Sequence, residues 1–216
     1  VELYQWFNYY LKDIGEEPEP MVQIQTNDGR WHLEETWPPE DMTWNMQEIG
    51  NSWSVTGSTV NAQGSTVTLV SEELTELTHI SGLPTLHLDV TTQACQGGQI
   101  FATLFDNTND LRLGHATMDI RYRDGGYDAK PTSPFSSYTM LMEFNPLDVV
   151  VPAGHTLRIE LTESGEDYLP SPCATNPLGG LDVDGGMIGL PIIDRPNSHD
   201  SWFLAPPWWD QQPIPE

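Results

Sequence analysis

Positive charge is the scarcest property of this 216-residue sequence. It has 8 Lys and Arg against 32 Asp and Glu, and only Lys12 and Lys130 are lysines, so its formal net charge is −24 at pH 7. Such a surface repels phosphate groups, which disfavours binding to nucleic acid or to anionic membranes. The acids are scattered along the chain, a pattern that suits a saline environment because salt screens the self-repulsion. An acidic variant in ordinary salt is the alternative.

Long apolar runs are also missing. No stretch approaches the roughly 20 apolar residues that a membrane-spanning helix needs, and residues 1–11 lack the basic start and apolar block of a signal peptide. The chain begins at Val without a Met, so we expect an internal fragment whose upstream part can hold a signal. An extracellular or cell-surface location is therefore favoured over a cytoplasmic one.

Cysteine occurs only twice, at Cys95 and Cys173, and the spacing fits no metal or redox motif. Each lies in a loop-like context. A disulfide is expected if the compartment is oxidising. Two free thiols remain the alternative, because the sequence does not give the Cα separation that a bridge requires.

Helical periodicity appears once, and period-two alternation dominates the rest. Residues 3–14 (LYQWFNYYLKDI) carry apolar residues at helical spacing, and Gly15 is a stop signal. From residue 22 onward short alternating segments follow, separated by turn residues; in ATMDIRYRD, for example, Met118, Ile120 and Tyr122 alternate. We predict an all-β, antiparallel jelly-roll sandwich with a short N-terminal helix.

Catalytic motifs are absent as well. The string closest to a nucleophile elbow, residues 50–54 (GNSWS), lacks the second Gly and a following helix. The six histidines form no metal-binding helical spacing, so we interpret them as surface or hydrogen-bonded structural residues. The sequence therefore predicts no catalytic residue and no required cofactor.

Two acidic loops are weak calcium candidates, because clustered oxygen ligands are what calcium prefers. They contain Asp106 and Asp110, and Asp182 and Asp184. With 32 acids such clusters also arise as solvated turns that cap their own backbone. Among the aromatics, Trp31, Trp37, Trp44 and Trp53 indicate either a sugar-binding platform or, as we favour, core filling and contact with a neighbouring domain.

Several blocks, taken in order, carry a family resemblance. Residues 6–12 (WFNYYLK) resemble a W-F-D-x-W-L-K helix, residues 80–92 (ISGLPTLHLDVTT) resemble I-x-G-x-P-x-L-x-L-x-V-S-T, and residues 152–159 (PAGHTLRI) resemble P-x-G-H-R-L-R-L. These motifs are similar to the C-terminal domain of the Xaa-Pro dipeptidyl-peptidase and CocE family of serine hydrolases, which includes cocaine esterase and α-amino acid ester hydrolase. The similarity extends over about residues 4–193.

The resemblance implies a galactose-binding-like jelly roll over residues 16–195, preceded by residues 1–15 as the helix that ends an upstream α/β-hydrolase domain. Residues 196–216 form a Trp/Pro-rich tail without a counterpart in the family. Trp6, Phe7 and Tyr10 are expected to contact the hydrolase domain, which would hold the catalytic residues. The chain alone is then no enzyme, but an accessory domain that shapes a substrate pocket or a homo-oligomer. The alternative is a free-standing β-sandwich that binds carbohydrate or assembles at a cell surface.

Overall fold

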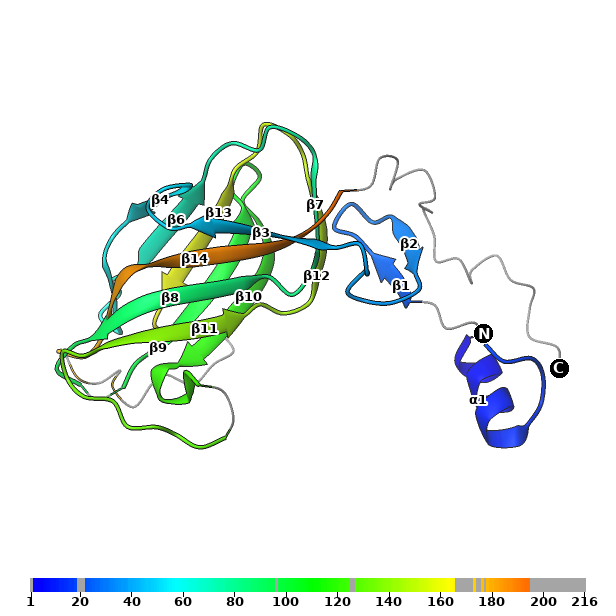
Figure 1. Cartoon of the computed structure of the whole chain (residues 1–216), viewed down its shortest axis with the longest axis horizontal. Coiled ribbons are helices and arrows are strands. Elements are labelled where there is room, and N and C mark those ends of the chain that lie inside the picture. The colour runs from blue at the N-terminus through cyan, green and yellow to red at the C-terminus, as the bar shows by residue number, and fades with distance from the viewer. Residues whose placement is uncertain are drawn as a thin grey trace.

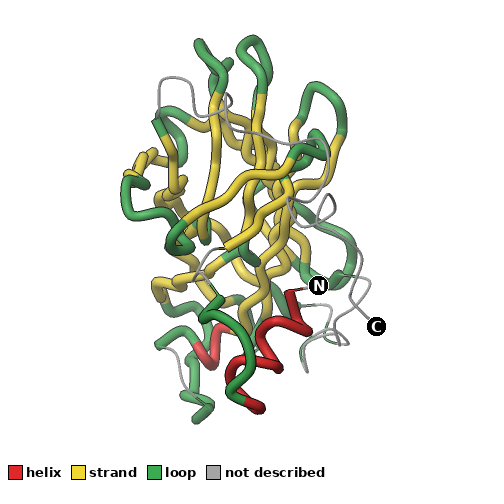
Figure 2. Tube along the Cα trace, turned by 90° about the vertical axis from the view of Figure 1, so that its right-hand side faces the viewer, coloured by secondary structure: helices red, strands yellow, loops and turns green. Residues whose placement is uncertain are grey.

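The computed structural model describes residues 2–18, 22–95, 97–124, 127–165, 173, 176 and 178–194. The predicted tail, residues 196–216, lies outside the described residues. Strands make up nearly all of the regular structure in the described part, with red confined to two short helices in Figure 2. No helix among the described residues has the length and apolarity needed to cross a bilayer.

The N-terminal helix α1 spans Glu2–Lys12, close to the predicted bounds. It ends before Gly15, because Asp13 already adopts a left-handed conformation (φ 54°) while its backbone N–H donates to the Tyr9 carbonyl over 3.1 Å. A single residue in this conformation is a common way for a helix to stop. Figure 1 shows α1 standing apart from the sandwich.

A two-stranded hairpin follows the helix. Strands β1 (Val22–Gln25) and β2 (Trp31–Glu34) pair antiparallel, and the turn contains Gly29 with a φ of 84°. The Asn27 side chain joins this turn to the sandwich: it donates to the Val150 carbonyl (3.1 Å) and accepts from the Val150 N–H (2.9 Å). The hairpin is thus fastened to an edge strand of the larger sheet, a position that otherwise exposes backbone groups.

Two antiparallel sheets form the sandwich (Figure 1). The five-stranded sheet has the order β10 (Leu111–Asp119), β9 (Gln99–Asp106), β13 (Leu157–Thr162), β6 (Val67–Ser71) and β4 (Trp53–Thr56). The seven-stranded sheet has the order β11 (Ser137–Glu143), β8 (Thr85–Thr92), β14 (Leu181–Ile193), β7 (Thr78–Gly82) and β12 (Leu147–Val151), with β3 (Thr43–Glu48) and β5 (Thr59–Val60) also paired to β14. The predicted all-β antiparallel sandwich with a short N-terminal helix is confirmed.

The core lies between the sheets and follows from the alternation of side chains along each strand. On β9 the inward residues Ile100, Ala102 and Leu104 are fully buried. Trp53 is the largest fully buried side chain, and its indole N–H donates to the Gln47 side-chain oxygen over 2.6 Å. This bond satisfies the one polar group that a buried Trp carries.

One strand prediction is wrong at its end. Met118 lies on β10, but Ile120 and Tyr122 belong to a 3₁₀ helix, η1 (Ile120–Tyr122), rather than to the predicted strand. The Asp119 carboxylate accepts from the Arg121 backbone N–H (2.9 Å) and so caps a helical turn. Ile120 still reaches the core, which explains why its alternation resembled that of a strand.

The two cysteines are bonded to each other. Cys95 follows β8 and Cys173 precedes β14, and the structure joins them in a disulfide with their Cα atoms 6.0 Å apart. The bridge closes a loop of 78 residues in sequence separation.

Candidate functional site

Three side chains that can each bind a metal ion converge where the hairpin meets the sandwich. They are His32 on β2, His79 on β7 and Asp148 on β12, with side chains only 3–4% exposed. Nε2 of His32 lies 3.0 Å and Nε2 of His79 lies 2.9 Å from Oδ1 of Asp148. This is the one group of three or more His, Cys, Asp or Glu found in metal-binding proximity within the described part of the chain.

Strand alternation explains how these residues meet. Asp148 pairs with Ser81 in the β7–β12 ladder, so Ser81, Asp148 and His79 share one face of the sheet. Ile80 and Val149 point the other way, into the core. The face that carries the polar residues is covered by the hairpin, whose own buried positions place His32 and Glu34 against it.

A second layer of contacts orients the cluster. Oε1 of Glu34 lies 3.2 Å from Nδ1 of His32, and the Ser81 hydroxyl donates to Oδ2 of Asp148 over 2.6 Å. The rings of His32 and His79 meet edge to face, with centroids 5.6 Å apart. Both atoms of the Asp148 carboxylate and both nitrogens of His32 are therefore engaged.

The charges of the cluster shift its titration. Burial alone would raise the pKa of Asp148, but hydrogen bonds from His32, His79 and Ser81 outweigh it and lower this pKa to about 2. Burial opposes the charged form of His32, yet the nearby carboxylates of Asp148 and Glu34 raise the pKa of its imidazole above the ordinary value. The carboxylate of Asp148 stays ionised at neutral pH for this reason.

Sequence reasoning interpreted these histidines as structural and did not place them together. The only local signal is the His-x-Glu spacing of His32 and Glu34, which puts both side chains on one strand face. The partners lie far away in sequence: 116 residues separate His32 from Asp148, and 69 residues separate His79 from Asp148.

The first calcium candidate is held by other protein groups. The Asp106 carboxylate accepts from the Asn109 side chain (3.1 Å) and lies 2.9 Å from Nδ1 of His155. Asp110 forms an ion pair with Arg158 (2.6 Å). The two carboxylates thus take up separate partners, and a calcium role for them stays a prediction.

The second candidate loop belongs to β14. Asp182 accepts from the Thr59 hydroxyl (2.6 Å) and from the Gln93 side chain (3.0 Å), and Asp184 accepts from the Thr91 hydroxyl (2.7 Å). These bonds link β14 to β5 and β8 within the sheet. Calcium binding here also stays a prediction.

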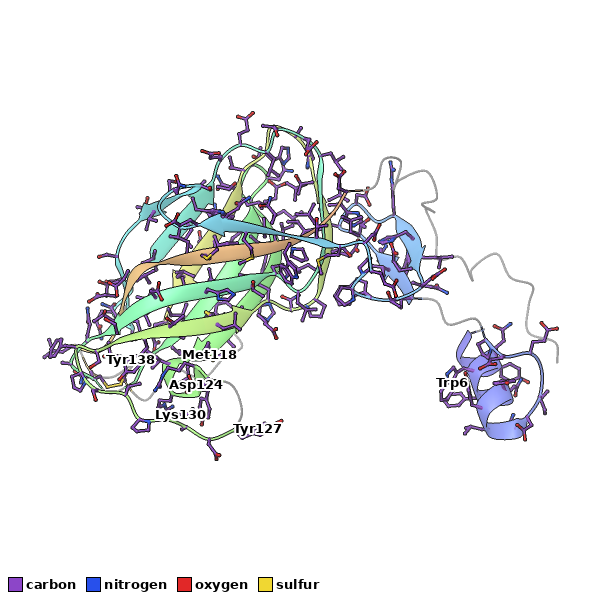
Figure 3. The ribbon with its side chains drawn as sticks, in the orientation of Figure 1. Trp6, Met118, Asp124, Tyr127, Lys130 and Tyr138 are labelled. Carbon is purple, nitrogen blue, oxygen red and sulfur yellow. A yellow bond between two sulfur atoms is a disulfide. The ribbon has the colours of Figure 1, made fainter. Side chains whose placement is uncertain are left out.

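The helix residues predicted to contact another domain are exposed in this chain. Trp6, Phe7 and Tyr10 have 47%, 45% and 50% of their surface accessible. Their rings pack on each other, with Trp6 5.4 Å from Phe7 and 4.9 Å from Tyr10 between centroids. Figure 3 shows Trp6 on α1, well away from the sandwich. Contact with another domain stays a prediction.

A second apolar surface lies on the outer face of the seven-stranded sheet. Pairing places Leu141 of β11, His87 of β8 and Met187 of β14 in one cross-strand row. Met46 and Trp44 continue it on β3, which pairs with β14. We call Trp44, Met46, Leu141 and Met187 the outer-face patch; each is 42–49% exposed.

The four tryptophans considered as a sugar platform therefore have different environments. Trp53 fills the core, Trp44 belongs to the outer-face patch, and Trp31 and Trp37 are half-buried beside the hairpin. Trp37 precedes Pro38 in a cis peptide bond. They do not form one exposed row.

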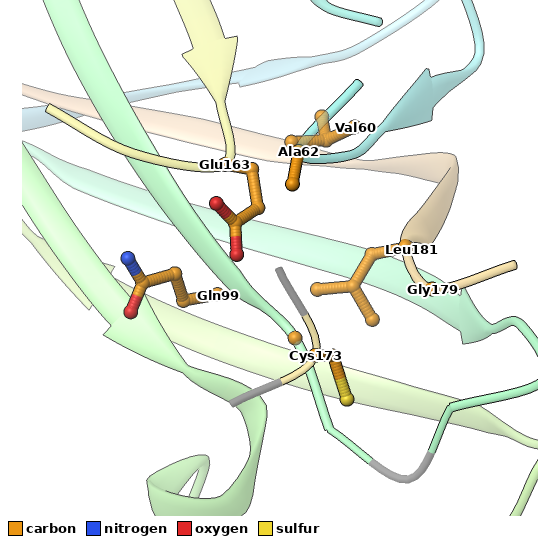
Figure 4. A pocket seen from close by; sticks show the side chains of 9 residues that line it. Val60, Ala62, Gln99, Glu163, Cys173, Gly179 and Leu181 are labelled. Carbon is orange, nitrogen blue, oxygen red and sulfur yellow. The ribbon is translucent and has the colours of Figure 1, made fainter. Parts of the chain in front are cut away.

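Two hollows lie elsewhere in the sandwich. One, shown in Figure 4, is a cavity of about 10 Å³ beside the disulfide, lined by Gln99, Glu163, Cys173 and Leu181 among others. It has room for about one water molecule. The other is a cleft of about 260 Å³ with a polar lining that includes Glu72, and among the described residues that line it there is no aromatic ring.

Comparison with known proteins places most of the sandwich in one family. Residues 45–181, well over half of the chain, match the model of the X-Pro dipeptidyl-peptidase C-terminal non-catalytic domain. No curated protein matches.

Solved structures share the fold at low sequence identity. An aminopeptidase from a marine sediment Thaumarchaeota archaeon is 15% identical, with a TM-score of 0.67 over 89% of this chain and 44% of its own. A CocE/NonD family hydrolase from Staphylococcus aureus is 13% identical, with a TM-score of 0.66 over 88% of this chain and 45% of its own. An α-amino acid ester hydrolase is 16% identical, with a TM-score of 0.64 over 88% and 44%. The chain thus spans less than half the length of these relatives.

Proposed function

Because this chain belongs to the X-Pro dipeptidyl-peptidase C-terminal non-catalytic domain family, we propose that it is the accessory domain of a serine hydrolase of the dipeptidyl-peptidase or CocE type. The parent enzyme would cleave an Xaa-Pro peptide bond or an ester through an acyl-enzyme. Its catalytic residues would lie in an α/β-hydrolase domain, and this domain would pack on it and shape the substrate pocket or the oligomer. The family match carries the proposal.

Two exposed apolar surfaces support it. The aromatic face of α1 and the outer-face patch both hold large side chains that are 42–50% exposed in this chain. Exposed apolar patches with polar rims are typical of protein contacts. We propose that the hydrolase domain covers both, since a helix with an apolar stripe gains most of its stability from packing that stripe.

The test uses the whole hydrolase polypeptide that contains this chain. Trp6→Ser combined with Tyr10→Ser is expected to speed proteolysis between the two domains and to raise KM for an Xaa-Pro or ester substrate severalfold. Tyr127→Ser, at a fully exposed residue away from both surfaces, is the matched control and should change neither. Unchanged proteolysis and kinetics in the double variant would contradict the proposal.

A second measurement separates the domain from the enzyme. The 216-residue chain by itself should hydrolyse p-nitrophenyl acetate no faster than buffer, whereas the whole polypeptide should turn it over. Turnover by the chain alone would reject an accessory role.

The exposed Trp44 favours a second candidate, a free-standing sandwich that binds carbohydrate or assembles with copies of itself. An aromatic ring on a sheet surface can stack on a sugar or on another chain. Analytical ultracentrifugation and affinity electrophoresis in polysaccharide gels compare the chain with its Trp44→Ala variant. A loss of self-association or of gel retardation in the variant would favour this candidate over the first.

The disulfide supports a further part of the proposal, an extracellular or cell-surface location. Disulfides persist in oxidising compartments and are rare in the cytosol. Mass spectrometry of the native protein after thiol alkylation should find Cys95 and Cys173 unlabelled; full labelling of both would argue for a reducing compartment.

A further inference from the structure

We propose that His32, His79 and Asp148 form a binding site for one divalent transition-metal ion, with Zn²⁺ as the probe, which clamps the N-terminal hairpin to the sandwich. The site does not depend on the proposed hydrolase partner, because all three ligands come from this chain.

The positions of the three ligand atoms carry the proposal. Nε2 of His32 and Nε2 of His79 both point at Oδ1 of Asp148, at 3.0 and 2.9 Å. Zinc binds nitrogen and oxygen ligands at about 2.0–2.2 Å, which sets ligand atoms about 3.3 Å apart in a tetrahedral site. Separating these pairs by a few tenths of an ångström is enough to seat an ion among them. Water or another group would supply the fourth ligand.

The kind of ligand selects the kind of ion. Two imidazoles and one carboxylate suit zinc and its neighbours, whereas calcium and magnesium prefer oxygen ligands alone. The three residues lie on β2, β7 and β12, so the ion would connect the hairpin to the two strands that it covers. Their burial shields the site from competing water.

The outer contacts are those that a metal-binding histidine commonly has. The Glu34 carboxylate, 3.2 Å from Nδ1 of His32, favours a proton on Nδ1 and so leaves Nε2 free to coordinate. The Ser81 hydroxyl binds Oδ2 of Asp148 and leaves Oδ1 directed at the two histidines. Second-layer partners of this kind typically change metal affinity by about 10–100-fold.

A network of hydrogen bonds without metal would use the same contacts, with imidazole N–H groups donating to Asp148. The two arrangements differ in what Zn²⁺ does. An ion at this site displaces protons from nitrogen, so its affinity falls as pH falls. It also stabilises the folded chain, because it binds the folded state and not the unfolded one.

The experiment titrates ZnCl₂ into the full chain after treatment with EDTA and dialysis. We expect one equivalent of Zn²⁺ to bind with a Kd in the micromolar range or tighter at pH 7.5, and binding to weaken at least tenfold at pH 5.5. Thermal unfolding should shift upward with Zn²⁺. Co²⁺ in place of Zn²⁺ should give the visible absorption bands of a tetrahedral site.

Variants locate the site. His79→Gln should weaken Zn²⁺ binding at least 100-fold, while His87→Gln, a half-buried histidine on the outer face of the same sheet, should leave it unchanged. If His79→Gln fails to fold by circular dichroism, Glu34→Gln serves in its place and should weaken binding about 10–100-fold. The proposal is overturned if the parent chain binds no Zn²⁺ at 1 mM, or if binding persists unchanged in the folded variant.

Discussion

The sandwich and the helix α1 contain similar apolar residues but treat them differently. In the sandwich, Trp53 and Phe144 are at most 2% exposed. On α1, Trp6 and Phe7 are almost half exposed. The described sandwich therefore buries its own large side chains, whereas α1 presents an apolar face to a partner. A domain that folds alone and a helix that needs a neighbour are what an accessory module would combine.

The hairpin stands between these extremes. One of its faces is covered through the His32 and Glu34 contacts, and Asn27 bonds its turn to Val150 at the sheet edge. It is thus polar where the sandwich is apolar and anchored where α1 is not. Four substitutions can test this gradient from the core outward.

The core should respond most. Trp53→Ala is expected to lower the free energy of unfolding by about 3–5 kcal/mol, because it leaves a large cavity and removes the partner of Gln47. Trp44→Ala, half exposed on β3, is the matched control and should cost less than about 1 kcal/mol. Urea unfolding followed by circular dichroism measures both. Equal costs would mean that the two rings are equally buried in solution.

Loss of the disulfide should come second. The double variant Cys95→Ser, Cys173→Ser frees a loop of 78 residues in sequence separation and should cost about 2–4 kcal/mol. The same unfolding measurement on the parent chain with reductant should agree with the variant. A parent chain whose stability ignores reductant would show that the bridge does not stabilise the sandwich.

The hairpin anchor should matter less. Asn27→Ala removes two hydrogen bonds to Val150 and should cost about 1–2 kcal/mol. Hydrogen exchange should quicken at the Val150 amide, which loses its acceptor, more than at core strands. Asn51→Ala, in an exposed turn between β3 and β4, should change neither quantity. Slower or unchanged exchange at Val150 would argue against the anchor.

The helix should matter least in this chain. Trp6→Ala is expected to change the free energy of unfolding by less than about 0.5 kcal/mol, since nothing in the described sandwich covers the ring. A loss above about 2 kcal/mol in chemical denaturation would show that α1 packs on the sandwich in solution and would remove the contrast drawn above.

The sequence predicted the sandwich because period-two alternation directly reports which face of a strand is buried. Ile100, Ala102 and Leu104 follow it without exception. It did not predict β14, whose Gly185, Gly186 and Pro191 are poor strand formers. A Cβ at Gly186 would lie 2.0 Å from the His87 carbonyl oxygen, so tertiary packing requires glycine there and overrides the local preference.

The histidine cluster was beyond local patterns for a related reason. Its members belong to three strands, and only the sheet register places Asp148 opposite Ser81 and beneath the hairpin. A spacing motif can reveal ligands on one helix or in one loop. It cannot reveal ligands that meet only after distant strands have paired.

The central place of β14 has a consequence for how the protein is made. It is the last described strand of the chain, and yet β3, β5, β7 and β8 all pair with it. During translation those four strands would wait with open edges until residues 181–193 leave the ribosome. Because pairing between strands so distant in sequence is slow, the nascent chain would be most prone to aggregate just before its synthesis is finished, and premature termination upstream of Leu181 would leave a seven-stranded sheet without its middle.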